Sequence, residues 1–360
     1  MKPTSSTQNT ASARPDTDSD PNSTFEPFFI VGAPRSGTTL LTVMLDRHSS
    51  IAMTPETKIF GDMRPQGRYR TFRNHEAVLN SFLFRTHLID LRLEPADVLE
   101  RCRDFEPTYR NYVRCVLETY RIQQGKPRIG EKTPEHMWDV PTILDWYPRS
   151  KVIWLLRDGR DGTLSIDRVL QRGLRTACFL WWQYAKFGQM WERRYPERFR
   201  RVTFESLVAH PKETLSEVLA FLGLEFEPSM LNTSVKSETV PEHEMGHKRT
   251  SLGALNPSKV GEYNRLATVE QQALMASIMD RQLVRLGYKP TDVAPVPART
   301  RLANALKNPV GFLLYQPWVR RFVNAAGLRL KVTALWRRLT AASRPRSPGS
   351  KSADEEIKVS

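Results

Sequence analysis

The segment FFIVGAPRSGTTLL, residues 28–41, constrains the fold of this 360-residue chain more than any other. Its first four residues are apolar and predict a short buried strand, while the apolar periodicity from Thr38 to Leu45 predicts a helix. A loop broken by glycine and proline joins the two. Gly32 and Gly37 have the spacing of the phosphate-binding loop G-x-x-x-x-G-K-[ST], but Thr38 stands where that loop has its lysine.

The cation of this loop lies at Arg35 instead of at the lysine position. The N–H groups at a helix start still favour an anion there, because they lack partners within the helix and lie at the positive end of its dipole. A kinase needs lysine and Mg²⁺ to neutralise a polyphosphate. A group of lower charge could be bound by Arg35 with the hydroxyls of Thr38 and Thr39, without a metal. The alternative is a glycine- and threonine-rich turn with a surface arginine.

A second segment, RSKVIWLLRDGRDGTLSIDRVL, repeats the opening pattern. Val152–Leu156 predicts a buried strand, residues 157–162 a turn, and Thr163 the start of a helix. Further on, RTACFLWWQYAKFGQMWERRY predicts a long helix and FRRVTFESL supplies a third strand. A last helix has Pro211 in its first turn and is ended by Gly223. Strands that alternate with helices predict an α/β fold, with a parallel sheet covered by helices on both faces.

Composition divides the chain into four parts. The Ser-, Thr-, Pro- and Asp-rich start predicts a disordered segment, and helical spacings rich in Leu, Arg and Glu predict a helical insertion in the main domain. A basic stretch with amphipathic periodicity follows the domain and precedes a disordered tail. The predicted parts are residues 1–27, the domain 28–290 with its insertion at about 64–128, the appendage 291–343, and the tail 344–360.

The net charge of +15 is concentrated near the C-terminus, where no acidic residue lies between Asp292 and Asp354. Twelve basic residues lie there: Arg299, Arg301, Lys307, Arg320, Arg321, Arg329, Lys331, Arg337, Arg338, Arg344, Arg346 and Lys351. The rest of the chain is close to neutral, so we predict no specific nucleic-acid binding. The apolar face of residues 318–326 suits either an anionic membrane surface or docking on its own domain or on a second subunit.

The three cysteines, Cys102, Cys115 and Cys178, form no C-x-x-C pair and predict neither disulfides nor a zinc site. No secretory leader and no continuous apolar run of about 18 residues is visible. We therefore expect a cytoplasmic protein, with peripheral membrane contact as an alternative, and no metal.

Two motifs together resemble a known family. PRSGTTLL is similar to the 5′-phosphosulfate loop of the sulfotransferases that use 3′-phosphoadenosine 5′-phosphosulfate (PAPS), and RDGRDGTLS resembles their 3′-phosphate site. The resemblance covers roughly Phe28 to Tyr288 and implies the P-loop-like sulfotransferase fold. It also implies PAPS as co-substrate, 3′-phosphoadenosine 5′-phosphate (PAP) as product, and no metal. By this resemblance the nucleotide-binding residues are Arg35, Ser36, Gly37, Thr38, Thr39, Arg157, Ser165 and Lys259.

Three shorter segments extend the resemblance. SKVGEY is similar to the late loop that closes over the nucleotide in this family and contains Lys259, while EKTP is similar to the family's strand end and contains Lys132. PETK is most like the Glu-Thr-Arg segment of the protein-tyrosine sulfotransferase branch, which implies that Glu56 is the general base and that Lys58 replaces an arginine. Arg35 and Lys132 would neutralise charge on the transferred group.

The chain also departs from that branch. Phe204 stands where the branch has a tyrosine near the nucleotide, and Thr250 and Ser251 have the wrong spacing for its late catalytic serine. A histidine base is the alternative to Glu56, with four candidates: His48, His136, His243 and His247. Glu56 and Lys132 could also be ordinary loop-end and strand-end residues, and Arg157 with Ser165 a structural turn.

The sequence thus predicts transfer of a sulfonyl group from PAPS to an acceptor hydroxyl, by in-line transfer with a glutamate base. The acceptor is a peptide tyrosine, a sugar, a lipid or a small molecule, and a homodimer stays open. Two other functions stay open: a nucleotide kinase or NTPase with a degenerate P-loop, and a non-catalytic membrane-associated adaptor.

Overall fold

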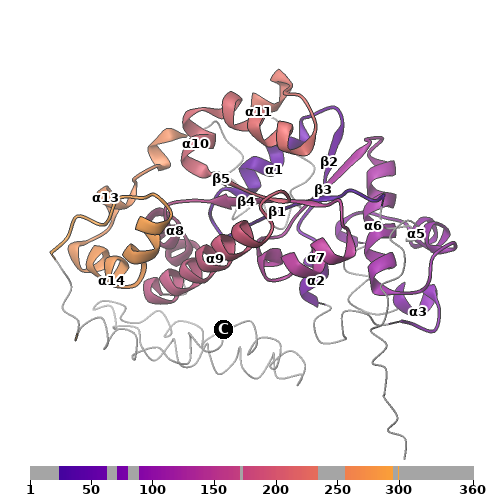
Figure 1. The fold of residues 1–360 in the computed structure, drawn as a ribbon, viewed down its shortest axis with the longest axis horizontal. Helices are drawn as coiled ribbons and strands as arrows, with labels where there is room; N and C mark the ends of the chain where they lie inside the picture. The colour runs from indigo at the N-terminus through magenta and orange to yellow at the C-terminus, as the bar shows by residue number, and fades with distance from the viewer. Residues whose placement is uncertain are drawn as a thin grey trace, which may run out of the picture.

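A parallel sheet forms the centre of the protein in a computed structural model that describes residues 24–62, 71–79, 89–170, 173–233, 256–294 and 299 (Figure 1). Its five strands lie in the order β2-β3-β1-β4-β5. Their bounds are Phe28–Gly32 for β1, Ile51–Met53 for β2, Arg128–Lys132 for β3, Lys151–Leu156 for β4 and Phe199–Thr203 for β5. The predicted α/β class is confirmed.

The central strand β1 pairs with two neighbours, so its end is flanked by two others. Ile30 lies opposite Lys132 of β3, and Gly32 lies opposite Leu155 of β4. Every residue of β1 is buried, because helices cover both faces of the sheet. The carboxyl ends of β3, β1 and β4 therefore meet at one edge, where α/β proteins bind their ligands.

Helices cover the two faces in separate layers (Figure 1). One face packs against α1 (Thr38–Asp46), α10 (Phe204–Ala209) and α11 (Pro211–Leu222), which share an apolar cluster with β1 and β4. The other face packs against α7 (Val140–Trp146), α8 (Gly159–Leu170) and α9 (Leu174–Arg194) in a larger cluster. Trp154 on β4 belongs to this larger cluster and contacts Gly188 of α9, where a Cβ would have no room.

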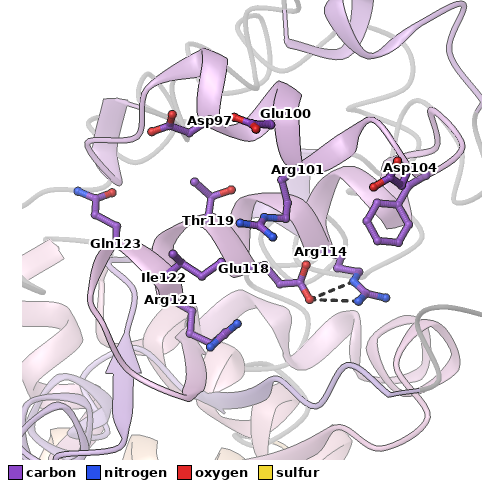
Figure 2. A pocket seen from close by; sticks show the side chains of 11 residues that line it. Asp97, Glu100, Arg101, Asp104, Arg114, Glu118, Thr119, Arg121, Ile122 and Gln123 are labelled. Carbon is purple, nitrogen blue, oxygen red and sulfur yellow. Dashed lines mark hydrogen bonds and ion pairs between the residues drawn. The ribbon is translucent and has the colours of Figure 1, made fainter.

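The insertion between β2 and β3 is helical where the structure describes it. It contains α2 (Ile59–Asp62), α3 (His75–Leu79), α5 (Pro95–Cys102) and α6 (Tyr109–Gln123). A hollow of about 700 Å³ lies between α5 and α6 and is lined mainly by charged side chains, among them the ion pair of Arg114 with Glu118 (Figure 2). None of the residues predicted for the active site lines this hollow.

The last described elements are the short helices η3 (Pro228–Leu231), η6 (Pro257–Lys259) and α13 (Tyr263–Leu266), followed by α14 (Val269–Arg285). Helix η3 contacts α1 and η6 contacts α10, whereas α13 contacts α8 and α14 packs against α9. The 3-10 helix η2 (Pro134–Trp138) follows β3 directly.

Two sequence predictions about local structure are wrong. The turn predicted for residues 157–162 is mostly helix, since α8 begins at Gly159. Asp158 makes this possible, because its Oδ1 accepts the Arg160 N–H at 2.9 Å as a helix cap does. The segment FRRVTFESL is a strand only as far as Thr203, after which α10 begins with Thr203 as its N-cap.

Several predictions concern residues outside the described ranges. These are most of the segment 1–27, most of the appendage 291–343, the tail 344–360, and His243, His247, Thr250 and Ser251. Membrane contact and dimerisation thus stay predictions, as do the domain boundaries. Among the described residues, no helix combines the length and apolar character needed to cross a membrane.

Candidate active site

The loop between β1 and α1 is held in an unusual backbone conformation. Arg35 has φ = 68° and Gly37 has φ = 95°, both in the left-handed region. Arg35 adopts it at an energetic cost, which is a feature common at binding sites. The Ser36 hydroxyl donates to Ala33 O at 2.7 Å and fixes the turn. At Gly37 a side chain would also meet the ring of Phe204, since a Cβ there would lie 2.5 Å from Phe204 Cδ2.

Helix α1 starts directly after this loop, with Thr38 and Thr39 as its first residues. Both threonines are buried, no side chain caps this end, and its first turn contains no acidic residue. The first N–H groups of a helix have no intrahelical acceptors, so this end is suited to an anion.

Arg157 follows β4 and reaches both loops that border the site. Its side chain is buried, and its Nη1 donates to Arg35 O at 3.2 Å while its Nη2 donates to Lys259 O at 2.7 Å. The guanidinium stacks on Phe204, 4.4 Å from the ring centroid. Its Nε is buried and finds no hydrogen-bond partner in the part of the chain that the structure describes. A buried cationic N–H without a partner is costly, which makes Arg157 a candidate for contact with a ligand.

Arg35 brings a second guanidinium to the same place. Its Nε donates to the Ser165 hydroxyl at 3.2 Å, so Arg35, Arg157 and Ser165 come together although they are far apart in sequence. Burial, and to a lesser extent the charge of Arg157, lowers the pKa of Arg35. Two cations held close in a partly buried site repel each other, and a bound anion would relieve that repulsion.

Glu56 and Lys132 form an ion pair at the end of the adjacent strand. Lys132 Nζ lies 2.5 Å from Glu56 Oε1, and their side chains are 3% and 14% exposed. Lys132 ends β3, which places it beside β1 and close to the loop that contains Arg35. A carboxylate and an ammonium thus lie one strand away from the paired arginines.

A buried network fixes the segment that contains Glu56. Glu131 Oε1 accepts hydrogen bonds from the hydroxyls of Thr57 at 2.8 Å and Thr133 at 2.7 Å. The Thr133 hydroxyl in turn accepts the Lys58 N–H at 3.1 Å. The segments Glu56–Lys58 and Glu131–Thr133 are therefore joined residue by residue, which positions Glu56 against Lys132.

Two of the four candidate histidines, His136 and His48, are described by the structure and are not suited to act as the base. His136 is fully buried, its Nδ1 lies 2.8 Å from Glu131 Oε2, and its Nε2 accepts the Phe60 N–H at 3.3 Å. His48 is also buried, with its Nε2 2.9 Å from Glu225 O and its Nδ1 accepting the Ser50 N–H. Neither ring has a free nitrogen that could take a proton from an acceptor.

The contribution of the Glu131 carboxylate to the stability of the folded protein depends on pH. Burial opposes its ionisation, but the contact with His136 and the hydrogen bonds from Thr133 and Thr57 outweigh burial and lower the pKa of Glu131 from the ordinary value of a glutamate. Because this pKa is lower in the folded state, its contribution to stability is complete above the unfolded value of about 4.3 and disappears as pH falls through the folded value.

We expect Glu131→Gln to reduce the free energy of unfolding at pH 7 by about 1–3 kcal/mol, the cost of leaving buried hydrogen-bonding groups poorly paired. The difference from wild type should shrink in acid. Urea unfolding at pH 7 and at successively lower pH measures both effects, with the exposed Glu100→Gln as the control. An equal difference at every pH would contradict the role assigned to the Glu131 carboxylate.

Lys259, which the family resemblance assigns to the nucleotide, is half-exposed in the structure. Its Nζ lies 2.9 Å from Glu262 Oε1, and it is its carbonyl that contacts Arg157. A phosphate contact by Lys259 therefore requires exchange of this ion pair and stays a prediction.

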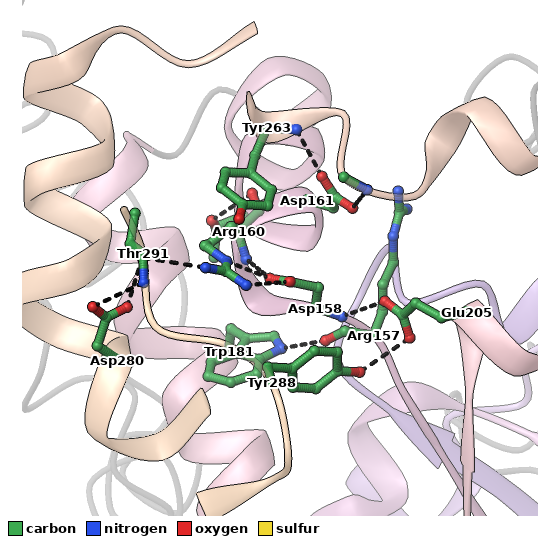
Figure 3. A network of polar contacts seen from close by, with 12 residues as sticks. Arg157, Asp158, Arg160, Asp161, Trp181, Glu205, Tyr263, Asp280, Tyr288 and Thr291 are labelled. Carbon is green, nitrogen blue, oxygen red and sulfur yellow. Dashed lines mark hydrogen bonds and ion pairs between the residues drawn. The ribbon is translucent and has the colours of Figure 1, made fainter. Parts of the chain in front are cut away.

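Sequence reasoning missed the residues that support this region from behind. Glu205 Oε1 accepts the Asp158 N–H at 2.8 Å and its Oε2 accepts the Tyr288 hydroxyl at 3.0 Å, while Asp161 contacts the segment that follows Lys259 (Figure 3). The signal was weak, because single acidic residues after a strand or in a helix start are common. Within the described ranges, no group of His, Cys, Asp or Glu could hold a metal ion.

The profile of the sulfotransferase family matches residues 27–228, which is more than half of the chain. The chain belongs to the sulfotransferase family. It is 24% identical to the protein-tyrosine sulfotransferase of Drosophila melanogaster over 215 residues, covering 57% of this chain and 39% of that protein. It is also 24% identical to protein-tyrosine sulfotransferase 1 of Danio rerio over 216 residues, covering 57% and 55%. The chain thus spans about half or less of the length of these two relatives.

Solved structures support the fold of this sulfotransferase family member. The sulfotransferase domain from the curacin biosynthetic pathway has a TM-score of 0.53 and 22% identity, and covers 74% of this chain and 98% of its own. The sulfotransferase domain from the Synechococcus PCC 7002 olefin synthase has a TM-score of 0.51 and 20% identity, and covers 73% and 95%. The predicted family and its P-loop-like fold are confirmed.

Proposed function

We propose that this family member transfers a sulfonyl group from PAPS to the hydroxyl of an acceptor and releases PAP. The observation that supports this most is the convergence of Arg35, Arg157 and Ser165 beside the start of α1. Such a site favours an anionic donor. Family membership makes sulfonyl transfer the expected class of chemistry.

The residues present fit a ligand with separate 5′ and 3′ anionic groups. The loop residues Arg35 to Thr39 and the first N–H groups of α1 would hold the 5′-phosphosulfate. Arg157, Ser165 and Lys259 would hold the 3′-phosphate, with the buried Arg157 Nε as one donor. Because Phe204 lies directly against Gly37 and Arg157, the two halves of the site have a common apolar wall.

In the proposed reaction, Glu56 has a different role from the two cations Lys132 and Arg35. PAPS supplies a sulfonyl group whose bond to the phosphate oxygen breaks as the acceptor oxygen bonds to sulfur. Glu56 accepts the proton of the acceptor hydroxyl, as a general base must when a neutral alcohol or phenol attacks. Lys132 and Arg35 stabilise the negative charge that develops on the transferred group and on the departing phosphate.

Glu56 and Lys132 are paired with each other in the structure, with Lys132 Nζ 2.5 Å from Glu56 Oε1. For Glu56 to take its proton, the acceptor hydroxyl must therefore approach beside this pair. Lys132 can then turn toward the sulfonyl oxygens while Glu56 turns to the hydroxyl. A tyrosyl peptide is the first acceptor to test, since the matching relatives are named protein-tyrosine sulfotransferases; sugars, lipids and small molecules are the others.

Calorimetric titration of the wild-type protein tests the donor directly. We expect PAP to bind tightly with or without Mg²⁺, and ATP with Mg²⁺ to bind much more weakly, because Thr38 replaces the lysine that a kinase needs. Preference for ATP with Mg²⁺ would contradict the proposal and favour a kinase or NTPase. Transfer of label from [³⁵S]PAPS to a tyrosyl peptide, a sugar, a lipid or a phenol then tests each acceptor class.

A further inference from the structure

We infer that Asp161 is a positioning residue. Its carboxylate holds the segment Lys259–Tyr263 against Arg157 before any nucleotide binds. This inference rests on the proposed function, because it assigns that segment to one wall of the nucleotide site. Asp161 lies within the motif RDGRDGTLS, but the resemblance assigned it no role.

The carboxylate of Asp161 binds the backbone of this segment twice. Its Oδ2 accepts the Gly261 N–H at 2.8 Å and its Oδ1 accepts the Tyr263 N–H at 2.8 Å (Figure 3). Only 3% of Asp161 is exposed. Gly261 has φ = 71°, a conformation that suits glycine and turns both N–H groups toward one carboxylate. Hydrogen bonds from N–H groups to a buried carboxylate are stronger than those between neutral groups.

Arg160, the residue before Asp161, contacts the same segment through a separate interaction. The Arg160 guanidinium lies 4.3 Å from the centroid of the Tyr263 ring. Arg160 is itself fixed, because its Nε and Nη2 donate to the two carboxylate oxygens of Asp158 at 3.0 and 2.7 Å. Its Nη1 lies 3.4 Å from the Thr291 hydroxyl, which donates to Asp280 Oδ1 on α14. The first turn of α8 therefore holds both the backbone and the ring of Tyr263.

The position of the segment Lys259–Tyr263 determines which N–H groups of Arg157 are available to a ligand. Lys259, two residues before Gly261, provides the carbonyl that accepts from Arg157 Nη2, and Arg35 provides the one that accepts from Nη1. With Nη1 and Nη2 each bound to one backbone carbonyl, Nε and the second N–H of each Nη are the donors that remain for an anion. If the segment were released, Arg157 would lose one of its two supports, and the wall of the site would open.

Asp161→Asn tests this with little change in shape. Asparagine has one acceptor oxygen, so one of the two N–H groups would face an NH₂ group. Asp167→Asn is the matched control, because Asp167 lies on the same helix and also accepts a backbone N–H, from Gly173. Two quantities are measured: hydrogen exchange of the Gly261 and Tyr263 amides without nucleotide, and the dissociation rate of PAP in stopped flow.

We expect Asp161→Asn to raise both rates by about tenfold or more, the change expected for losing a hydrogen bond to a charged acceptor. Asp167→Asn should leave both rates within about twofold of wild type. Unchanged exchange and dissociation in Asp161→Asn would overturn the inference. Wild type alone provides a second test, since unprotected Gly261 and Tyr263 amides would overturn it even if the variant failed to fold. Absence of PAP binding to a wild type with protected amides would instead refute the proposed function.

Discussion

Replacing Arg157 by alanine is expected to weaken PAP binding by about 30- to 100-fold, which corresponds to roughly 2–2.7 kcal/mol. The variant loses a charged donor at a buried Nε that has no protein partner in the described chain. It also loses the bridge between the carbonyls of Arg35 and Lys259, so the two loops would no longer be held at a fixed distance. Calorimetric titration with PAP measures the change.

Arg157→Lys separates charge from geometry. Lysine keeps the charge, but its single ammonium cannot reproduce the planar fork of a guanidinium that contacts two carbonyls and stacks on Phe204. We therefore expect it to recover less than about tenfold of the lost affinity. Arg193→Ala, an exposed arginine in the last turn of α9, is the control and should bind PAP as wild type does. Full affinity in Arg157→Ala would remove Arg157 from the binding site.

Replacing Glu56 by glutamine is expected to lower kcat for sulfonyl transfer by about 10²- to 10⁴-fold, the range that a general base contributes. Glutamine has nearly the same size and can still accept a hydrogen bond from Lys132, but it cannot take the proton of an acceptor hydroxyl. The affinity for PAP should change by less than about threefold, since Glu56 is negatively charged and does not itself bind the anionic nucleotide. Initial rates with saturating PAPS, together with PAP titrations, give both values.

The control for Glu56 is matched in burial and pairing. Glu118 has a side chain 15% exposed and pairs with Arg114 at 3.1 Å, whereas Glu56 is 14% exposed and pairs with Lys132. Because Glu118 lies in α6, remote from the loop of Arg35 in sequence, Glu118→Gln should keep the kcat of wild type. Equal rates for Glu56→Gln and wild type would show that another group is the base.

The local sequence pattern predicted those strands and helices in which the residue types agree with the burial and backbone conformation that the fold requires. The run that forms β1 is apolar throughout and is buried on both faces, so its sequence alone indicates a central parallel strand. Helix α11 lies between Pro211 and Gly223, as predicted, because proline suits a first helical turn and Gly223 adopts φ = 76°. In both cases the residue type and the backbone requirement coincide.

Pattern failed where tertiary contacts overrule local preference. Sequence pattern predicted neither β2, which has three residues, nor β3, which ends in the charged and buried Glu131 and Lys132. Only the resemblance of EKTP to the family's strand end indicated where β3 ends. The charges of Glu131 and Lys132 are tolerated because each has a partner from a segment distant in sequence. The early start of α8 depends in the same way on Asp158.

The sequence by itself determined the family, the position of the loop that we propose binds the donor, and the candidate residues, because those depend on motifs that are local and ordered along the chain. Only the tertiary structure decided that Arg157 divides its donors between two loops and that His136 is fully used by Glu131 and Phe60. It also decided that Asp161 holds the late segment. These facts depend on which groups meet across the sheet edge, and hydrogen-bond geometry between distant residues leaves no periodic trace in a single sequence.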